Sequence, residues 1–295
     1  MPSPPSAADR EGDPSVGAET PEPASAQERT IGGRDLTEWR SAAGRRLVAV
    51  VAAVSAALAG LLRWSRANLA LVVTVLVGGV LFLVLEALAA EVYEAVVERD
   101  GLQALDQPVL DAAVRLRTPA RDAAVTAFTD LGSTVGMTSI VVVCTVTLAL
   151  VRRSWTPVVL ASVAAAGSVL MTVLGKDLVG RTRPPSTLAV PPLESSPSFP
   201  SGHTLNATVL IGVLAYLVLL GMTRLWMRVL IGTVAVLFVL AMGLSRVYLG
   251  HHWLTDVVAG WLLGLGWLVA VVTAHRVQLT LRDRDPETGR TGPSS

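Results

Sequence analysis

Cysteine, lysine and charged residues in general are scarce in this sequence of 295 residues. Cys144 is the single cysteine, so an intramolecular disulfide is excluded, and packing explains its place in an apolar run. The histidines do not form the spaced clusters that zinc sites require, so we expect neither a metal centre nor a cofactor. Lys176 is the only lysine among arginines, which singles that position out. The four histidines are His203, His251, His252 and His275.

The low charge excludes an ordinary soluble domain. Charged residues make up 16% of the chain and hydrophobic residues 52%, which is too apolar for a soluble protein of this length. The membrane is the expected solvent. The formal net charge of +1 gives no overall attraction to nucleic acid, so we expect no nucleic-acid partner.

Six apolar runs are each close to the ~20 residues that span a bilayer core. Arginines cluster in alternate connections, beginning with Arg63 and Arg66 before the first run and Arg152 and Arg153 after the second. By the positive-inside rule these connections are cytoplasmic, and so are both termini. We predict an all-α, multi-pass transmembrane helical bundle with about six core spanning helices in the plasma membrane. The runs are 69–85, 135–151, 156–175, 204–223, 229–244 and 257–274.

The N-terminal part divides into a polar tail and one further apolar run. Residues 1–30 are rich in Pro, Ser, Ala, Glu and Asp, so we interpret them as a disordered cytoplasmic tail. A seventh span at 47–62 would place Arg45 and Arg46 outside, against the charge rule, so we expect a helix partly inserted from the cytoplasmic side. The predicted regions are the tail 1–30, the membrane-associated helix region 31–68, the main membrane domain 69–274 and a polar cytoplasmic tail 275–295.

Two longer segments fall on the opposite, outward face. Residues 91–130 carry both charge signs and apolar residues at helical spacing, such as Leu105, Val109 and Leu110, which predicts amphipathic helices. Residues 184–200 contain six prolines and cannot form a helix, so we expect an extended cover on the same face.

Three polar clusters lie at the outward-facing ends of the predicted helices. Any one basic residue could extend to lipid headgroups, but several positive charges at one depth are tolerated only if an anion such as phosphate neutralises them. A serine and a glycine before a helix fit an ordinary N-cap and turn, and they also fit free backbone N–H groups that bind an oxyanion. The clusters are Lys176 with Arg181 and Arg183, then Ser201-Gly202-His203, then Ser245-Arg246 with His252 and Asp256.

His252 and Asp256 are spaced i, i+4, so a helix beginning near His252 would place both on one face. A carboxylate that accepts the N–H of one ring nitrogen fixes the tautomer and leaves the other nitrogen free for attack. A lone His-Asp pair at a helix start is more often structural, and here the neighbouring cationic clusters favour catalysis. His251 has no such partner by spacing, and we interpret it as a loop residue bordering the site.

These residues resemble the motifs of the type 2 phosphatidic acid phosphatases, a superfamily that includes vanadium-dependent haloperoxidases and some bacterial acid phosphatases. The resemblance covers residues 69–274, with the three motifs in the family's order and at its intervals. The motifs are Lys176, six residues, Arg183-Pro184; then Pro200-Ser201-Gly202-His203; then Ser245-Arg246, five residues, His252, three residues, Asp256.

The resemblance implies a role for each motif residue. His252 would attack phosphorus, His203 would protonate the leaving group and Asp256 would orient His252. The phosphate oxygens would be bound by Lys176, Arg183, Ser201, Gly202 and Arg246. In phosphoryl transfer the protein mainly positions groups and stabilises charge, which suits a site rich in Lys and Arg.

The expected function is a metal-independent phosphatase whose site lies on the non-cytoplasmic face and whose partner is a lipid phosphate from the bilayer. Undecaprenyl diphosphate, phosphatidic acid and phosphatidylglycerophosphate are all candidate substrates. Two alternatives are a haloperoxidase with vanadate in the phosphate site, disfavoured because relatives with that activity are soluble, and a non-catalytic membrane protein that binds an anion.

Overall fold

The computed structural model describes residues 30–31, 34–35 and 42–282, which divide into two units at Ala67 and Asn68. The first unit contains two short antiparallel strands, β1 (Thr30–Ile31) and β2 (Arg34–Asp35), and the helix α1 (Ala42–Ala67). The predicted tail lies outside the described residues except for Thr30. The apolar run predicted at 47–62 is part of a 26-residue helix, and its segment Arg46–Trp64 is long and apolar enough to cross a membrane.

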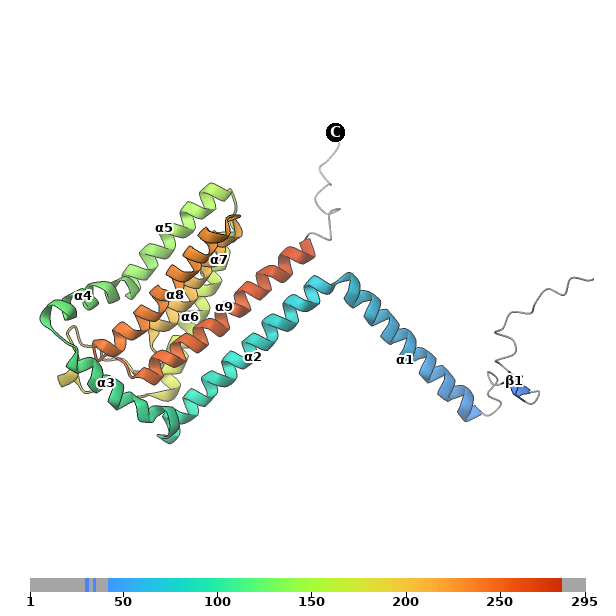
Figure 1. Cartoon of the computed structure of the whole chain (residues 1–295), viewed down its shortest axis with the longest axis horizontal. Coiled ribbons are helices and arrows are strands. Elements are labelled where there is room, and N and C mark those ends of the chain that lie inside the picture. Colours follow the sequence, from blue (N-terminus) through green and yellow to red (C-terminus); the bar gives the residue numbers. More distant parts are fainter. Residues whose placement is uncertain (1–29, 32–33, 36–41, 283–295) are drawn as a thin grey trace, which may run out of the picture. The chain divides into compact units, whose positions relative to one another are not determined.

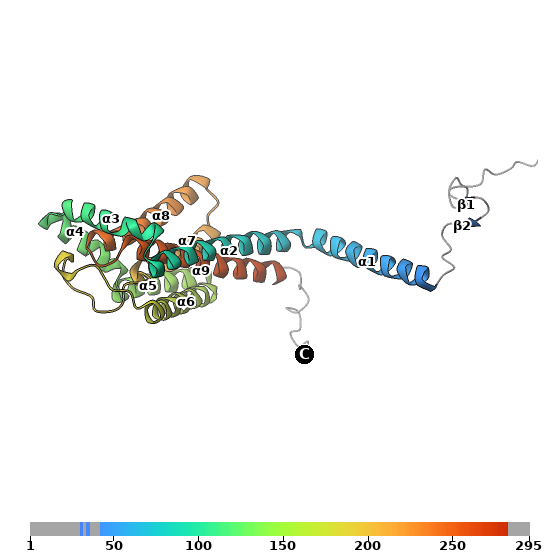
Figure 2. The same cartoon turned by 90° about the horizontal axis from the view of Figure 1, so that it is seen from below.

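The second unit is a helical bundle (Figures 1 and 2). Six of its helices are long and apolar enough to span a bilayer, and with α1 they make seven candidate spans among the described residues. Large apolar side chains on their outer surfaces are exposed, as expected where lipid is the solvent. The spanning helices are α2 (Leu69–Glu98), α5 (Thr134–Arg152), α6 (Thr156–Val179), α7 (Gly202–Leu220), α8 (Leu225–Tyr248) and α9 (Leu254–Arg282).

Two helices extend further than the apolar runs predict. The helix α2 continues to Glu98, so residues 91–98 belong to a spanning helix and not to the amphipathic segment. The helix α9 continues to Arg282, eight residues beyond the expected end of the membrane domain. Polar residues prolong both helices because a helix keeps its backbone hydrogen bonds beyond the hydrocarbon layer. Buried His275, expected in a polar tail, instead pairs its Nδ1 with Tyr216 Oη at 2.8 Å.

The rest of the predicted amphipathic segment folds into short helices at one end of the bundle. These are the 3₁₀ helix η2 (Gly101–Leu105), α3 (Asp106–Arg115), α4 (Pro119–Thr129) and the 3₁₀ turn η3 (Asp130–Gly132). Leu110 is fully buried, as the helical spacing predicted, whereas Leu105 is 49% exposed. The helix α4 begins where the Thr118 hydroxyl accepts the Arg121 N–H and proline occupies the first turn.

The proline-rich loop covers the same end of the bundle, as predicted, with only a 3₁₀ turn at η4 (Ser186–Leu188). Arg117 fixes the loop because its guanidinium donates to the carbonyls of both Leu188 and Tyr248. The Val190 N–H donates to the Leu249 carbonyl at 2.9 Å. The loop is therefore attached both to the short helices and to the end of α8.

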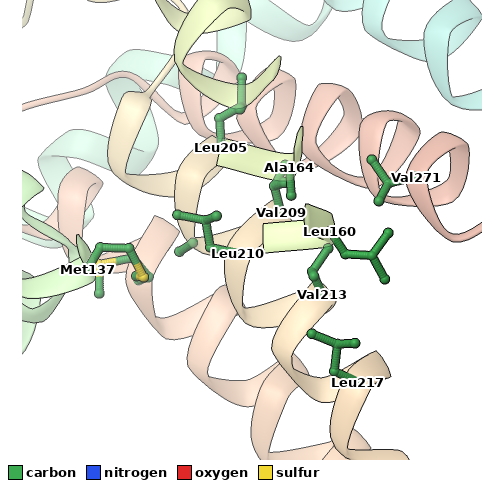
Figure 3. Close-up of a cluster of buried hydrophobic side chains, with 11 residues drawn as sticks. Met137, Leu160, Ala164, Leu205, Val209, Leu210, Val213, Leu217 and Val271 are labelled. Carbon is green, nitrogen blue, oxygen red and sulfur yellow. The ribbon is translucent and has the colours of Figure 1, made fainter. Parts of the chain in front are cut away.

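The helix α7 lies at the centre of the bundle, and half of its most apolar 18-residue stretch is buried. Its side chains form the main core with residues of α5, α6 and α9 (Figure 3). Gly260 and Gly264 on α9 let the two backbones approach, since a Cβ on Gly264 would lie 2.7 Å from Thr208 Cβ. This close contact fixes the start of α7 against the start of α9, where the motif histidines lie.

Candidate active site

The polar clusters predicted from the sequence gather at one end of the bundle. The helices run alternately up and down, so the C-terminal ends of α6 and α8 meet the N-terminal ends of α7 and α9. His203 and His252 line one cavity of about 310 Å³, together with Lys176 and Gly202. The structure thus brings the two imidazoles and the only lysine to one place.

The His252 imidazole is held in a single orientation. Its Nδ1 lies 3.3 Å from Asp256 Oδ2, and its Nε2 lies 3.2 Å from Arg183 Nη1. An arginine can only donate, so Nε2 is the unprotonated nitrogen and Nδ1 carries the proton toward Asp256. Burial lowers the pKa of His252 to about 4, although its hydrogen bond to Asp256 acts in the opposite direction. At neutral pH the site therefore presents an uncharged imidazole whose unprotonated Nε2 faces Arg183.

Asp256 is fully buried in the first turn of α9 and is surrounded by donors. Its Oδ2 accepts the Trp253 N–H at 2.9 Å and the Ser198 hydroxyl, and its Oδ1 accepts from Arg181 Nη1 at 2.6 Å. Such hydrogen bonds to the charged form offset the cost of burying a carboxylate. Asp256 is therefore held in place independently of His252.

Arg181 connects Asp256 to a second carboxylate that sequence reasoning missed. Arg181 Nη2 lies 2.6 Å from Asp106 Oδ2, and the Thr255 N–H and hydroxyl donate to Asp106 at 2.9 and 2.8 Å. The side chains of Arg181 and Asp106 are 9% and 5% exposed, so this is a buried ion pair. The sequence places Arg181 in a cluster predicted to bind an anion, whereas in the structure it pairs with Asp256 and Asp106.

Arg183 and Arg246 point to one carboxylate, that of Glu194. Arg183 Nη2 lies 2.7 Å from Glu194 Oε2, and Arg246 Nη2 bonds Glu194 Oε1. Burial alone would raise the pKa of Glu194, but Arg246 and Arg183 lower it to about 2. Glu194 is also part of the cavity wall beside His203 and His252. The counter-anion required by the clustered cations is therefore, in this structure, a side chain of the proline-rich loop.

The remaining bonds of the basic residues fix their directions. Arg183 donates to the Ser196 carbonyl at 2.7 Å and to the His251 carbonyl at 2.6 Å, while Lys176 Nζ donates to Ser196 Oγ at 2.6 Å. Arg246 is 2% exposed and donates from Nη1 to the Thr129 hydroxyl at 3.2 Å, a contact with no sequence signal.

Ser201, predicted to bind phosphate, and His251, predicted to border the site, are both buried. Ser201 precedes α7 but makes no side-chain cap, and its fully buried hydroxyl accepts from Thr204 Oγ1 at 2.9 Å. Among the predicted phosphate ligands, it is Lys176 and Gly202 that line the cavity, and Ser201 does not. His251 is buried, its Nε2 bonds the Val190 carbonyl at 2.7 Å, and it therefore holds the proline-rich loop.

A larger cavity of about 610 Å³ lies behind Arg181, beside Arg99, Gln103 and Trp253. Neither His203 nor His252 is among its lining residues, so it is separate from the cavity of the two motif histidines. No group of three or more His, Cys, Asp or Glu side chains converges as a metal site within the described part of the chain. A metal-free reaction stays a prediction.

The site and bundle together define a multi-pass membrane protein with a cluster of basic side chains beside a His–Asp pair. Comparison with known proteins gives the family. The model of the PAP2 superfamily matches residues 156–279. Phosphatidylglycerophosphatase B of Bacillus subtilis is 34% identical over 176 residues, which are 58% of this chain and 83% of that protein. The crystal structure of a transmembrane PAP2-type phosphatidylglycerolphosphate phosphatase from Bacillus subtilis shares 30% identity and a TM-score of 0.58, covering 67% of this chain and 95% of that one. The chain belongs to the PAP2 superfamily and is a membrane phosphatase, as the motifs predicted.

The buried ion pair between Arg181 and Asp106 can be tested by Arg181→Met. Removing the guanidinium leaves two buried carboxylates without a cation, so we expect the free energy of unfolding to fall by about 3–5 kcal/mol. Thermal unfolding in detergent measures this loss. Arg115→Met, at an exposed arginine of α3, is the matched control and should leave the midpoint unchanged. Equal midpoints for both variants would show that the pair does not stabilise the fold.

Glu194 can be tested as the resident anion by Glu194→Gln. The amide removes the negative charge that competes for Arg183 and Arg246, so phosphate and vanadate should bind roughly tenfold tighter. Inhibition constants of both oxyanions measure the change, with Glu98→Gln as a control distant from the cavity. Unchanged or weaker oxyanion binding would show that Glu194 does not occupy their site.

Proposed function

We propose that the protein hydrolyses the phosphate of a lipid-linked phosphomonoester or diphosphate through a phosphohistidine on His252. One observation carries this proposal: His252 presents an unprotonated Nε2 beside Arg183, while Asp256 holds its Nδ1. A neutral, oriented imidazole is a nucleophile that needs no further activation. His203 lines the same cavity and is the group available to exchange a proton.

In the first step, Nε2 of His252 attacks phosphorus and the bond from phosphorus to the leaving oxygen breaks. His203, in its protonated form, donates a proton to that oxygen. The ring of His252 becomes cationic, and the Asp256 carboxylate stabilises it. Lys176, Arg183 and Arg246 neutralise the phosphoryl oxygens, and free N–H groups at Gly202 add the partial positive charge of a helix N-terminus.

In the second step, water attacks phosphorus and the phosphorus–nitrogen bond breaks. His203 accepts the proton of the water, which restores the starting protonation state. Phosphate leaves with its charge balanced by Arg183 and Arg246. In this cycle Glu194 exchanges with the phosphoryl group, because both bind the same guanidinium groups.

A lipid substrate is supported by the surroundings of the cavity. It continues from the histidines along the walls of α5, α6 and α7, where Met137, Val169 and Leu210 are apolar. Undecaprenyl diphosphate, phosphatidic acid and phosphatidylglycerophosphate remain the candidates. The name of the Bacillus relative makes phosphatidylglycerophosphate the first to test.

We place the site on the non-cytoplasmic face of the plasma membrane and both termini in the cytoplasm. Arg152, Arg153, Arg224 and Arg228 lie at the opposite end of the bundle from the histidines, as the positive-inside rule requires for that orientation. Crossing of the membrane by α1 would instead place the residues before it outside.

The histidine roles predict different losses in two variants. His252→Ala should lower phosphate release by roughly 10⁴-fold or more with every substrate and form no phosphoenzyme. His203→Ala should retain the first-turnover release of p-nitrophenol from p-nitrophenyl phosphate, whose leaving group needs no proton. It should then accumulate labelled phosphoenzyme because the second step lacks its base. Rapid-quench labelling with radioactive phosphate measures both.

His275→Gln is the control, because His275 bonds Tyr216 at the opposite end of the bundle. Label on the His252→Ala protein would exclude this residue as the nucleophile. Equal losses of the first-turnover rate on lipid and p-nitrophenyl substrates in His203→Ala would exclude a proton donor at that position.

The orientation can be tested with single cysteines in a Cys144→Ala background, which has no other thiol. Leu193→Cys lies exposed in the proline-rich loop, and Thr223→Cys lies exposed in the connection between α7 and α8. An impermeant maleimide should label position 193 in intact cells and position 223 only after permeabilisation. The reverse pattern would place the site in the cytoplasm.

A further inference from the structure

The cavity holds polar groups that phosphate binding does not use. From His203 it extends toward the middle of the bundle, between α5, α6 and α7. The part beyond the histidines contains apolar residues and also a set of hydroxyl and amide side chains, within helices that otherwise present apolar surface. Polar groups inside a membrane bundle are costly and usually have a partner. The additional polar groups are Ser133, Thr134, Thr138, Ser168, Thr172 and Asn206.

Three of these hydroxyls already donate a hydrogen bond to a backbone carbonyl. Ser133 Oγ donates to the Asp130 carbonyl at 2.6 Å, Ser168 Oγ to Ala165 at 3.0 Å and Thr172 Oγ1 to Ser168 at 2.8 Å. A hydroxyl has one proton and two lone pairs, so each of these oxygens can only accept a further bond. These three oxygens therefore offer acceptors to a ligand.

Among these six side chains, Asn206 carries a buried polar atom without a partner. Its Oδ1 is buried and receives no hydrogen bond, although the side chain lines the cavity. A buried acceptor left unpaired costs free energy that a donor from a ligand would recover. Asn206 lies three residues after His203 on α7, so both side chains are on the same face of the helix, about one turn apart. A hydroxyl next to the leaving oxygen would therefore lie within reach of Asn206.

We propose that Asn206 is a specificity-determining residue that binds a hydroxyl group adjacent to the phosphate ester, as found in a glycerol headgroup phosphorylated at its end. This inference rests on the proposed function, because His203 marks the position of the leaving oxygen. The hydroxyl donates to Asn206 Oδ1, and the Asn206 Nδ2 group and the hydroxyls of Thr134 and Thr138 can donate to oxygens further along the headgroup.

Other leaving groups provide no hydrogen-bond donor for Asn206 Oδ1. The leaving group of a prenyl diphosphate is a phosphate whose oxygens only accept, and a diacylglycerol presents ester oxygens that also only accept. Either would leave Asn206 Oδ1 unpaired. A site that hydrogen-bonds a substrate hydroxyl rejects the analogue that lacks it, because the protein group stays buried and unsatisfied.

The test compares two lipids that differ in one hydroxyl. One carries a 1-phosphoglycerol headgroup and the other a 3-phosphopropanol headgroup on the same phosphatidyl lipid, both in mixed detergent micelles. For the wild-type protein, kcat/KM should be about tenfold to a hundredfold higher for the hydroxylated lipid. In Asn206→Leu the ratio should fall to about one, mainly through the hydroxylated lipid, while hydrolysis of p-nitrophenyl phosphate stays unchanged.

Thr145→Val is the matched control. It also removes a buried polar atom without a partner from a membrane helix, but Thr145 does not line the cavity, so the ratio should keep its wild-type value. Equal kcat/KM values for the two lipids in the wild-type protein would overturn the proposal without any variant. A retained preference in Asn206→Leu, or in Asn206→Ala, would also overturn it. Failure of the wild-type protein to hydrolyse either lipid and p-nitrophenyl phosphate would refute the proposed function itself.

Discussion

The carboxylate of Asp256 is buried at the start of α9, where it accepts hydrogen bonds from Arg181, Ser198 and the Trp253 N–H while facing His252. Each donor comes from a different part of the site end: the segment after α6, the proline-rich loop and the turn before α9. A carboxylate in such a position is tolerated only when it is well hydrogen-bonded, so these parts must assemble for Asp256 to remain charged. Together with the contact of Arg183 to Nε2, the carboxylate sets the proton on His252 Nδ1 and leaves Nε2 unprotonated.

Charge balance is the second constraint on the site. Arg183 and Arg246 cannot lie buried side by side without an anion, and Glu194 provides one. Both arginines are also anchored by bonds to protein oxygens, Arg183 on Ser196 and Arg246 on Thr129. Their directions are therefore fixed before any phosphate arrives. Because the two guanidinium groups are already oriented, they lose little entropy when an oxyanion replaces the Glu194 carboxylate.

Much of the architecture could be predicted from the sequence because its signals are regular. Apolar runs gave the spanning helices, and the alternation of direction placed Lys176, His203 and His252 at one end. Helix ends were missed at Glu98 and Arg282, since hydropathy marks the hydrocarbon layer and not the end of a helix.

The supporting side chains could not be found in this way. Asp106 lies 75 residues from Arg181 in the chain, and nothing local marks it as the partner. Glu194 did leave a signal, because it is the only acidic residue in the proline-rich loop opposite a set of cations. In the sequence, Asn206 is a polar residue within an apolar helix and has no further signal. Only the structure shows that its buried Oδ1 has no partner.

The helix or loop that carries each group suits the role of that group in the proposed chemistry. His203 and Asp256 belong to α7 and α9, whose backbones are held in close contact through Gly260 and Gly264. Glu194 and Ser196 belong to the loop, which has no regular secondary structure there. Groups that must keep a fixed distance during proton and phosphoryl transfer are thus on packed helices, and the carboxylate that must yield to phosphate is on a loop. Exchange of Glu194 for an oxyanion can then proceed without moving the histidine that attacks or the carboxylate that orients it.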